Sequence, residues 1–152
     1  MQLPSVTTQL AQQCRCIADS FQRLLGRPLV AAGAGDPVQA LWEAPRVIVA
    51  HRAGPDPVFF YGNRLALELF EMDWAAFTQL PSRLSAEPLV RDERARLLAR
   101  VARDGYIDDY AGVRISRTGR RFHIAQAIVW NLIDDSGAPC GQAATFDRWQ
   151  ML

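Results

Sequence analysis

Histidine and cysteine side chains can bind metals, and cysteines can form disulfides, but this chain contains few of either residue. The only histidines are His51 and His123, and the three cysteines are Cys14, Cys16 and Cys140. A zinc site needs three or four such donors at recognisable spacing, whereas the histidines fall in separate stretches and the first two cysteines are one residue apart. An odd number of thiols with that spacing also does not fit a disulfide framework. We therefore expect no metal and reduced thiols.

Paired carboxylates and loop serines could supply acid–base or nucleophilic chemistry. Asp134-Asp135 falls in a predicted turn and Asp108-Asp109 at the start of a predicted strand, so we interpret both pairs as solvated acids. Ser82 and Ser85 lie in a predicted loop near Glu87. With only two distant histidines, a serine nucleophile is less expected than turn formation.

One acid–base pair remains open as an alternative function. His123 with Asp109 or Tyr110 would suit a small cone-type α+β enzyme that isomerises, cyclises or hydrates its substrate. A buried histidine within hydrogen-bond reach of a carboxylate would favour this enzyme. A strand order with the first strand between the second and the last would instead favour a PAS-like sheet.

The composition excludes other classes of function. The 152 residues include 17 basic residues, all arginine, against 16 acidic ones, and the net charge is +1. Nonspecific phosphate binding favours a far more basic chain, so we expect no nucleic-acid partner. No apolar run reaches the ~20 residues of a spanning helix, and Met1 to Thr8 lacks signal-peptide features. We therefore predict a cytoplasmic protein without membrane contact.

The elements that must position these residues begin with a helical lead-in over residues 1–45. Apolar residues recur every three or four positions across 6–25, as in an amphipathic helix. A second, short helix is predicted over 36–42, where an aspartate precedes a proline. We expect the lead-in to pack on the remaining domain, residues 46–152, and to form one compact unit with it.

Residues 46–152 predict an antiparallel sheet interrupted by helices. Asn63 and Asp73 are predicted helix caps, and a charged, leucine-rich helix is predicted over 88–104. Runs of β-branched and aromatic residues predict strands over 47–51, 58–61, 106–116, 121–133 and 141–149. This order gives an α+β, PAS-like fold, with a five-stranded antiparallel sheet, helices on one face and an additional N-terminal helix.

Four stretches of the chain carry a resemblance to a known family. They are FFYGNRLALELFEMDW, LPSRLSAE, DGYIDDYAGVRISRTGRRFHIAQAIVWNLID and GQAATFDRW. Together they resemble the MEKHLA domain family, a PAS-related domain of bacterial and algal proteins and of plant class III homeodomain-leucine-zipper proteins. The similarity spans Pro57 to Trp149, with the earlier helix included. The string that names the family is absent, which fits the bacterial stand-alone branch. The resemblance implies a PAS-like fold and a sensory or protein-interaction role, without supplying a reaction.

Asn63 illustrates how pattern and resemblance agree. Its side chain is expected to accept hydrogen bonds from the free amides of the following helix, and Asn63→Ala should cost ~1 kcal/mol. The resemblance implies the same structural role, because the matching asparagine of PAS domains commonly fastens the first core helix.

The resemblance also bears on cofactors. Haem-binding PAS domains normally use a histidine of the helical region, and flavin adducts or acyl-linked chromophores need a cysteine there. Residues 63–104 contain neither residue type. We therefore predict no cofactor, with a noncovalent flavin left open as an alternative.

Both faces of the last strands read as apolar. Strict alternation would send Phe122, Ile124, Gln126, Ile128 and Trp130 to one face, and the alternate residues, also largely apolar, to the other. An antiparallel sheet with one wet face should be apolar on one side only. We therefore expect the second face to be covered by the helix over 6–25 or by a second subunit, and we predict a homodimer.

These observations predict a sensor or interaction module rather than an enzyme. It would bind a small apolar or amphipathic ligand and signal through contact with a downstream protein. The predicted ligand-binding residues are Tyr61, Tyr110, Arg114, Trp130 and Gln142. Arg114 would supply charge and Gln142 hydrogen bonds, while the aromatic rings would supply apolar contact.

Overall fold

One antiparallel sheet forms the centre of the molecule, and its strand order confirms the PAS-like prediction. The computed structural model describes residues 1–31, 35–87 and 91–152. Across the sheet the order is β2-β1-β5-β4-β3, so the first strand lies between the second and the fifth. The strands are β1 (Val47–Arg52), β2 (Phe59–Gly62), β3 (Tyr106–Ile115), β4 (Arg121–Ile133), β5 (Pro139–Phe146) and β6 (Trp149–Met151).

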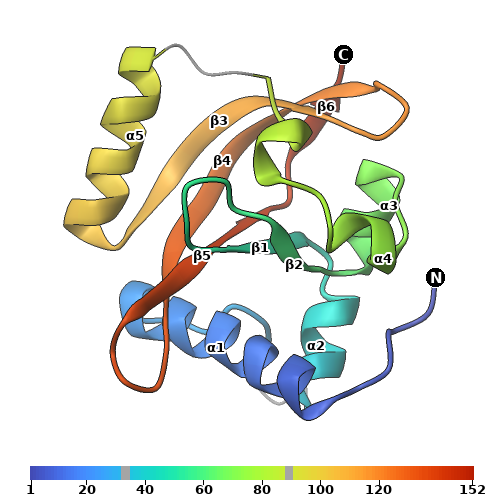
Figure 1. Ribbon diagram of the computed structural model, residues 1–152, viewed down its shortest axis with the longest axis vertical. Coiled ribbons are helices and arrows are strands. Elements are labelled where there is room, and N and C mark those ends of the chain that lie inside the picture. Colours follow the sequence, from blue (N-terminus) through green and yellow to red (C-terminus); the bar gives the residue numbers. More distant parts are fainter. Residues whose placement is uncertain (32–34, 88–90) are drawn as a thin grey trace.

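Helices cover both faces of this sheet (Figure 1). α1 and α2 lie on one face, while the remaining helical elements lie on the other face or at its edge. The helical elements are α1 (Thr8–Leu25), α2 (Pro37–Glu43), α3 (Arg64–Phe70), α4 (Trp74–Phe77), the 3-10 helix η1 (Ser82–Ser85) and α5 (Arg91–Asp104). Within residues 1–31, 35–87 and 91–152, no helix has the length and apolar character needed to cross a membrane.

The N-terminal helix has the boundaries that its sequence dictates. The Thr7 hydroxyl accepts from the amide of Leu10 at 3.1 Å, and Gly26 ends the helix in the left-handed conformation with φ 72°. Glycine adopts this conformation without the steric cost that a Cβ adds. Apolar residues of α1 pack on β1 and β4, so α1 supplies the cover that the apolar sheet requires.

Asn63 is completely buried and does more than cap α3. Its Oδ1 accepts from the amides of Ala66 and Ile48, both at 3.1 Å. Its Nδ2 donates to the carbonyl of Leu41 at 3.1 Å and to that of Arg46 at 2.7 Å. The side chain therefore joins α2, β1 and α3 through hydrogen bonds that use all of its polar atoms.

The predicted alternation along β4 is wrong because of a bulge at Gln126. This residue has φ 54°, and the pairing with β3 loses its regular register nearby. Phe122 and Ile124, before the bulge, pack in the cluster beneath α3, whereas Ile128 and Trp130, after it, pack beneath α1. The one additional residue therefore turns the side chains that follow it to the opposite face of the sheet from the one that strict alternation predicts.

The predicted strand over 141–149 is two strands. β5 pairs with the second half of β4. The chain then bends at Asp147, and β6 pairs with Phe122 to Ile124 at the beginning of β4. One long strand can pair with two short ones in this way, so the sheet has six strands rather than five. The predicted helix over 88–104 is observed as α5 from Arg91, and its first three residues lie outside the described residues.

Candidate functional site

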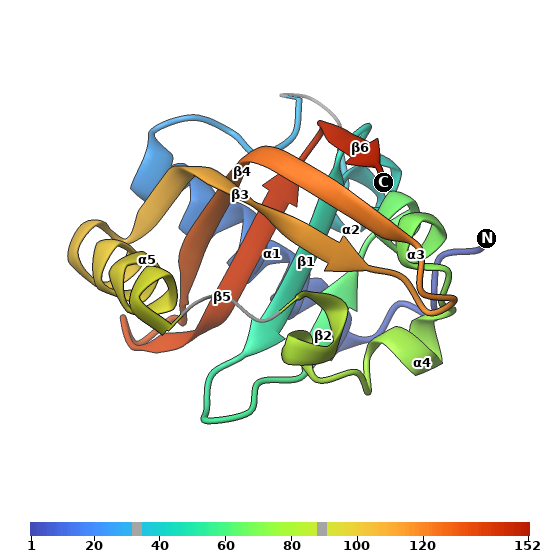
Figure 2. The ribbon, with the colours of Figure 1, turned by 90° about the horizontal axis from the view of Figure 1, so that it is seen from above.

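A pocket of about 990 Å³ opens between the sheet and the helical elements on its α5 side. Its floor comes from β1, β5, β4 and β3, and its walls come from η1, α5 and the segment after β1. Figure 2 views this side of the molecule, with α5 and η1 nearer to the viewer than α1. The size lies at the upper end of the range for small-molecule sites.

Two neighbouring rows of cross-strand partners form the centre of the floor. His51, Gln142 and Asn131 lie in register across β1, β5 and β4, and Gln142 Nε2 donates to Asn131 Oδ1 at 3.2 Å. The next row on the same face of these strands is apolar and consists of Val49, Ala144 and Val129. The floor therefore changes from polar to apolar along the strands, as a site for an amphipathic molecule requires.

Arg114 of β3 places a positive charge at the wall of the pocket. Its guanidinium donates to Ser85 Oγ and to Tyr110 Oη, each at 3.3 Å, and lies 5.6 Å from the centre of the Tyr110 ring. Among the described residues no carboxylate pairs with Arg114. Two neutral hydroxyls at long distances leave the charge of a guanidinium uncompensated, so an anionic group is the natural additional partner.

His51 adds a neutral acceptor to the polar row. Its Nδ1 lies 2.9 Å from the carbonyl oxygen of Arg52, so a neutral ring donates from Nδ1 and keeps a lone pair on Nε2. Burial lowers the pKa of His51, and the positive charge of Arg114 lowers it further, against the opposing effect of the Arg52 carbonyl. At neutral pH the imidazole is therefore uncharged.

Leucines of the covering elements form an apolar rim around the pocket. Leu84 of η1 and Leu98 of α5 line it and are 54% and 49% exposed. Apolar side chains that line a pocket in this way can contact the apolar part of a ligand.

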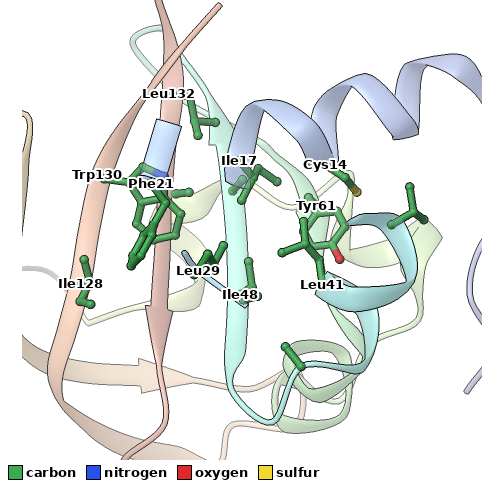
Figure 3. Packing of buried hydrophobic residues seen from close by; sticks show 14 of the residues in the cluster. Cys14, Ile17, Phe21, Leu29, Leu41, Ile48, Tyr61, Ile128, Trp130 and Leu132 are labelled. Carbon is green, nitrogen blue, oxygen red and sulfur yellow. The ribbon is translucent and has the colours of Figure 1, made fainter. Parts of the chain in front are cut away.

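The structure brings three of the five predicted ligand-binding residues together. Tyr110, Arg114 and Gln142 line the pocket. Tyr61 and Trp130 instead lie on the opposite face, in the cluster beneath α1 that Figure 3 shows. Tyr61 Oη and Trp130 Nε1 are buried without a hydrogen-bond partner in the part of the chain that the structure describes. Burial raises the pKa of Tyr61 well above its usual range. Ligand contact by any of the five stays a prediction.

The sequence alone does not indicate that His51 and Asn131 line this pocket. It offers His51 only as a possible metal ligand, and it offers Ser85, which accepts a hydrogen bond from Arg114 beside the pocket, only as a nucleophile or turn former. The signal for the polar row was the register of β1, β5 and β4, in which His51 and Asn131 are both partners of Gln142. That register follows from strand order, which no single segment of the sequence determines.

The acid–base pair of the alternative enzyme is not assembled. In the described residues His123 makes no hydrogen bond with Asp109 or Tyr110, and Asp109 instead pairs with Arg100 at 2.7 Å. Among residues 1–31, 35–87 and 91–152 there is also no group of three His, Cys, Asp or Glu side chains arranged to hold a metal.

Comparison with protein families gives one family match. A family model described as the MEKHLA domain matches residues 11–151, which includes most of α1. The chain is 25% identical to the homeobox-leucine zipper protein ATHB-9 of Arabidopsis thaliana, over 100% of this chain and 19% of that protein. It is 26% identical to HOX10 of Oryza sativa subsp. indica, over 95% of this chain and 18% of that protein. The chain thus spans about a fifth of the length of these plant relatives, and the predicted bacterial origin stays a prediction.

Solved structures with a similar backbone are PAS and light-oxygen-voltage domains. A PAS domain from Colwellia psychrerythraea has a TM-score of 0.60 and 10% identity, over 75% of this chain and 92% of that one. A light-oxygen-voltage domain studied with a flavin analogue has a TM-score of 0.57 and 15% identity, over 80% of this chain and 88% of that one. At these identities the likeness establishes the fold and leaves the ligand open.

Proposed function

Because this chain belongs to the MEKHLA domain family, whose model matches residues 11–151, we propose that it is a PAS-like sensory module. In this proposal it binds a small amphipathic anion in the pocket of about 990 Å³ and signals through contact with another protein. The observation that carries the proposal is the positive charge of Arg114. This residue lines a pocket with a partly apolar floor, and it has no carboxylate partner among the described residues.

The pocket suggests how such a molecule would lie. Its acidic group would accept from the Arg114 guanidinium, beside the hydroxyls of Ser85 and Tyr110. Its apolar body would lie along the Val49, Ala144 and Val129 row, under the leucines of α5. A second polar group could reach Gln142 or the lone pair on His51 Nε2, which a neutral imidazole offers as an acceptor.

Two fluorescent probes of similar shape test the role of charge. Anilinonaphthalene sulfonate is an apolar anion, and N-phenylnaphthylamine is its uncharged counterpart. Wild-type protein should bind the anion at one site per chain. Arg114→Gln should weaken that binding about tenfold to 100-fold, since a hydrogen bond to a charged group contributes ~1.5–3 kcal/mol, and should leave the uncharged probe unaffected.

A matched control separates this charge from the general charge of the protein. Arg117 is an exposed arginine in the turn after β3, outside the pocket, so Arg117→Gln should bind both probes as the wild type does. If Arg114→Gln and Arg117→Gln bind the anion equally well, Arg114 does not recognise the ligand and the proposal fails.

Protein contacts belong to the same proposal. α1 already covers the apolar face of the sheet, so the sheet alone does not require a second subunit. Val6 and Met151, which are 56% and 41% exposed, are candidate contact residues of the proposed homodimer. Sedimentation velocity at micromolar concentration tests it, and a monomer with or without the anionic probe would contradict dimerisation.

A further inference from the structure

Two cysteines from distant parts of the chain meet at the α1 face of the sheet, away from the ligand pocket. Cys16 lies on α1 and Cys140 at the beginning of β5. Their sulfur atoms are 4.0 Å apart, although 124 positions separate the residues. Both thiols are free and partly exposed, so a small reagent can reach them.

Hydrogen bonds hold Cys16 in this position. Its sulfur donates to the carbonyl of Ile133 at 3.4 Å and lies 3.9 Å from Ser20 Oγ. Ser20 Oγ in turn accepts from the amide of Ile133 at 3.0 Å. One turn of α1 is thereby fixed against the end of β4, next to the strand that carries Cys140.

A small hollow gives access to Cys16. It measures about 180 Å³, and Cys16, Ser20 and Arg15 are among the residues that line it. This volume is large enough for a molecule of the size of hydrogen peroxide, since water itself needs only about 30 Å³.

We propose that Cys16 and Cys140 are a peroxide-reactive thiol pair whose disulfide ties α1 to β5. The thiolate of Cys16 attacks one peroxide oxygen, the O–O bond breaks, and Cys16 becomes a sulfenic acid as hydroxide leaves. The Cys140 sulfur then attacks the Cys16 sulfur, and the hydroxyl departs as water. The two thiols lose two electrons and two protons, and hydrogen peroxide is reduced to two molecules of water.

The surroundings of the cysteines divide the roles. Burial, followed by the neighbouring Cys16, raises the pKa of Cys140 to about 11, so Cys140 is mostly protonated at neutral pH and is a poor first nucleophile toward peroxide. We assign it the second step, in which it loses its proton as it attacks the adjacent sulfenic acid. Cys14, on the same helix, is fully buried, and burial raises its pKa to about 12. Cys14 is therefore an internal control that peroxide should not oxidise.

Bond formation requires the sulfurs to approach from 4.0 Å to about 2 Å, so the proposal requires both cysteine side chains to rotate. The new bond would keep α1 on the apolar face of the sheet. Because it closes a loop of more than 100 residues, the chain-entropy model predicts a rise in Tm of about 10 °C.

Peptide mapping of the full chain after peroxide treatment at neutral pH tests the pair. Trypsin cuts after arginine and places the cysteines in separate peptides, with Cys14 in Met1–Arg15, Cys16 in Cys16–Arg23 and Cys140 in Phe122–Arg148. We expect the last two peptides to be joined without reductant and separated with it. Cys14→Ser should give the same product, and both Cys16→Ser and Cys140→Ser should abolish it.

A thermal unfolding scan supplies a second measurement on the same samples. Peroxide should raise the Tm of the wild type and of Cys14→Ser. It should not change the Tm of Cys16→Ser or of Cys140→Ser. The proposal is overturned if the bond involves Cys14, if it joins two chains, if Cys16 is oxidised without a link to Cys140, or if the linked protein has an unchanged Tm.

Discussion

Replacement of Asn63 by alanine tests how the central elements are held together. The side chain makes hydrogen bonds to four backbone groups, two amides and two carbonyls, and it is 0% exposed. Asn63→Ala removes all four bonds at once, and an alanine methyl group can replace none of them.

The burial of these partners determines the size of the effect. A helix cap alone contributes ~1 kcal/mol, and a buried backbone group that loses its partner costs about 1–3 kcal/mol. With about 1 kcal/mol for each of the four bonds, Asn63→Ala should lower the free energy of unfolding by about 4 kcal/mol. The ~1 kcal/mol expected from the sequence therefore covers only the bond to Ala66.

Asp73 is a matched control because it caps α4 with one hydrogen bond to the amide of Ala76, at 2.8 Å and in contact with solvent. Asp73→Ala should cost ~1 kcal/mol. Equilibrium urea unfolding, followed by circular dichroism with equal m-values, gives both numbers. Equal losses for the two variants would refute the argument that Asn63 joins three elements, and would leave it as an ordinary cap.

Three further predictions concern residues of the sheet. Tyr61→Phe removes a hydroxyl that is buried without a partner among the described residues; urea unfolding should show a gain of ~1 kcal/mol, and a loss would indicate that the hydroxyl has a partner. The folded state lowers the pKa of His51, so the unfolded chain binds more protons near pH 6. Stability should therefore fall as the pH drops from about 7.5 to about 5.5, and the urea midpoint of His51→Gln should vary less over that range. Gly141 has φ 155° and lies against the backbone of His51, so Gly141→Ala should cost about 2 kcal/mol; an unchanged Tm would contradict this.

Much of the fold follows from local patterns. The apolar spacing of α1, the caps at Asn63 and Asp73 and the β-branched strands depend on neighbouring residues, and these predictions held because tertiary contacts reinforce them. The break between β5 and β6 was missed, because it depends on which part of β4 each strand pairs with.

The candidate site was predicted less completely for a related reason. Side-chain direction along β4 depends on a single bulge at Gln126, and one such residue moves Trp130 from the expected face to the other. The β-strand propensity of the sequence does not reveal a bulge of this kind. A glutamine with φ 54° is stabilised by its tertiary surroundings, which include a hydrogen bond from Arg148 to the Gln126 side chain at 2.7 Å.

The sequence by itself determined the element types, the apolar character of both sheet faces and the resemblance to a family. Only the tertiary structure decided which residues share a pocket and which thiols meet. The physical reason is the separation along the sequence over which each interaction acts. Helix periodicity and capping act over a few neighbouring residues, whereas the meetings of His51 with Gln142 and of Cys16 with Cys140 depend on pairing and packing between distant segments.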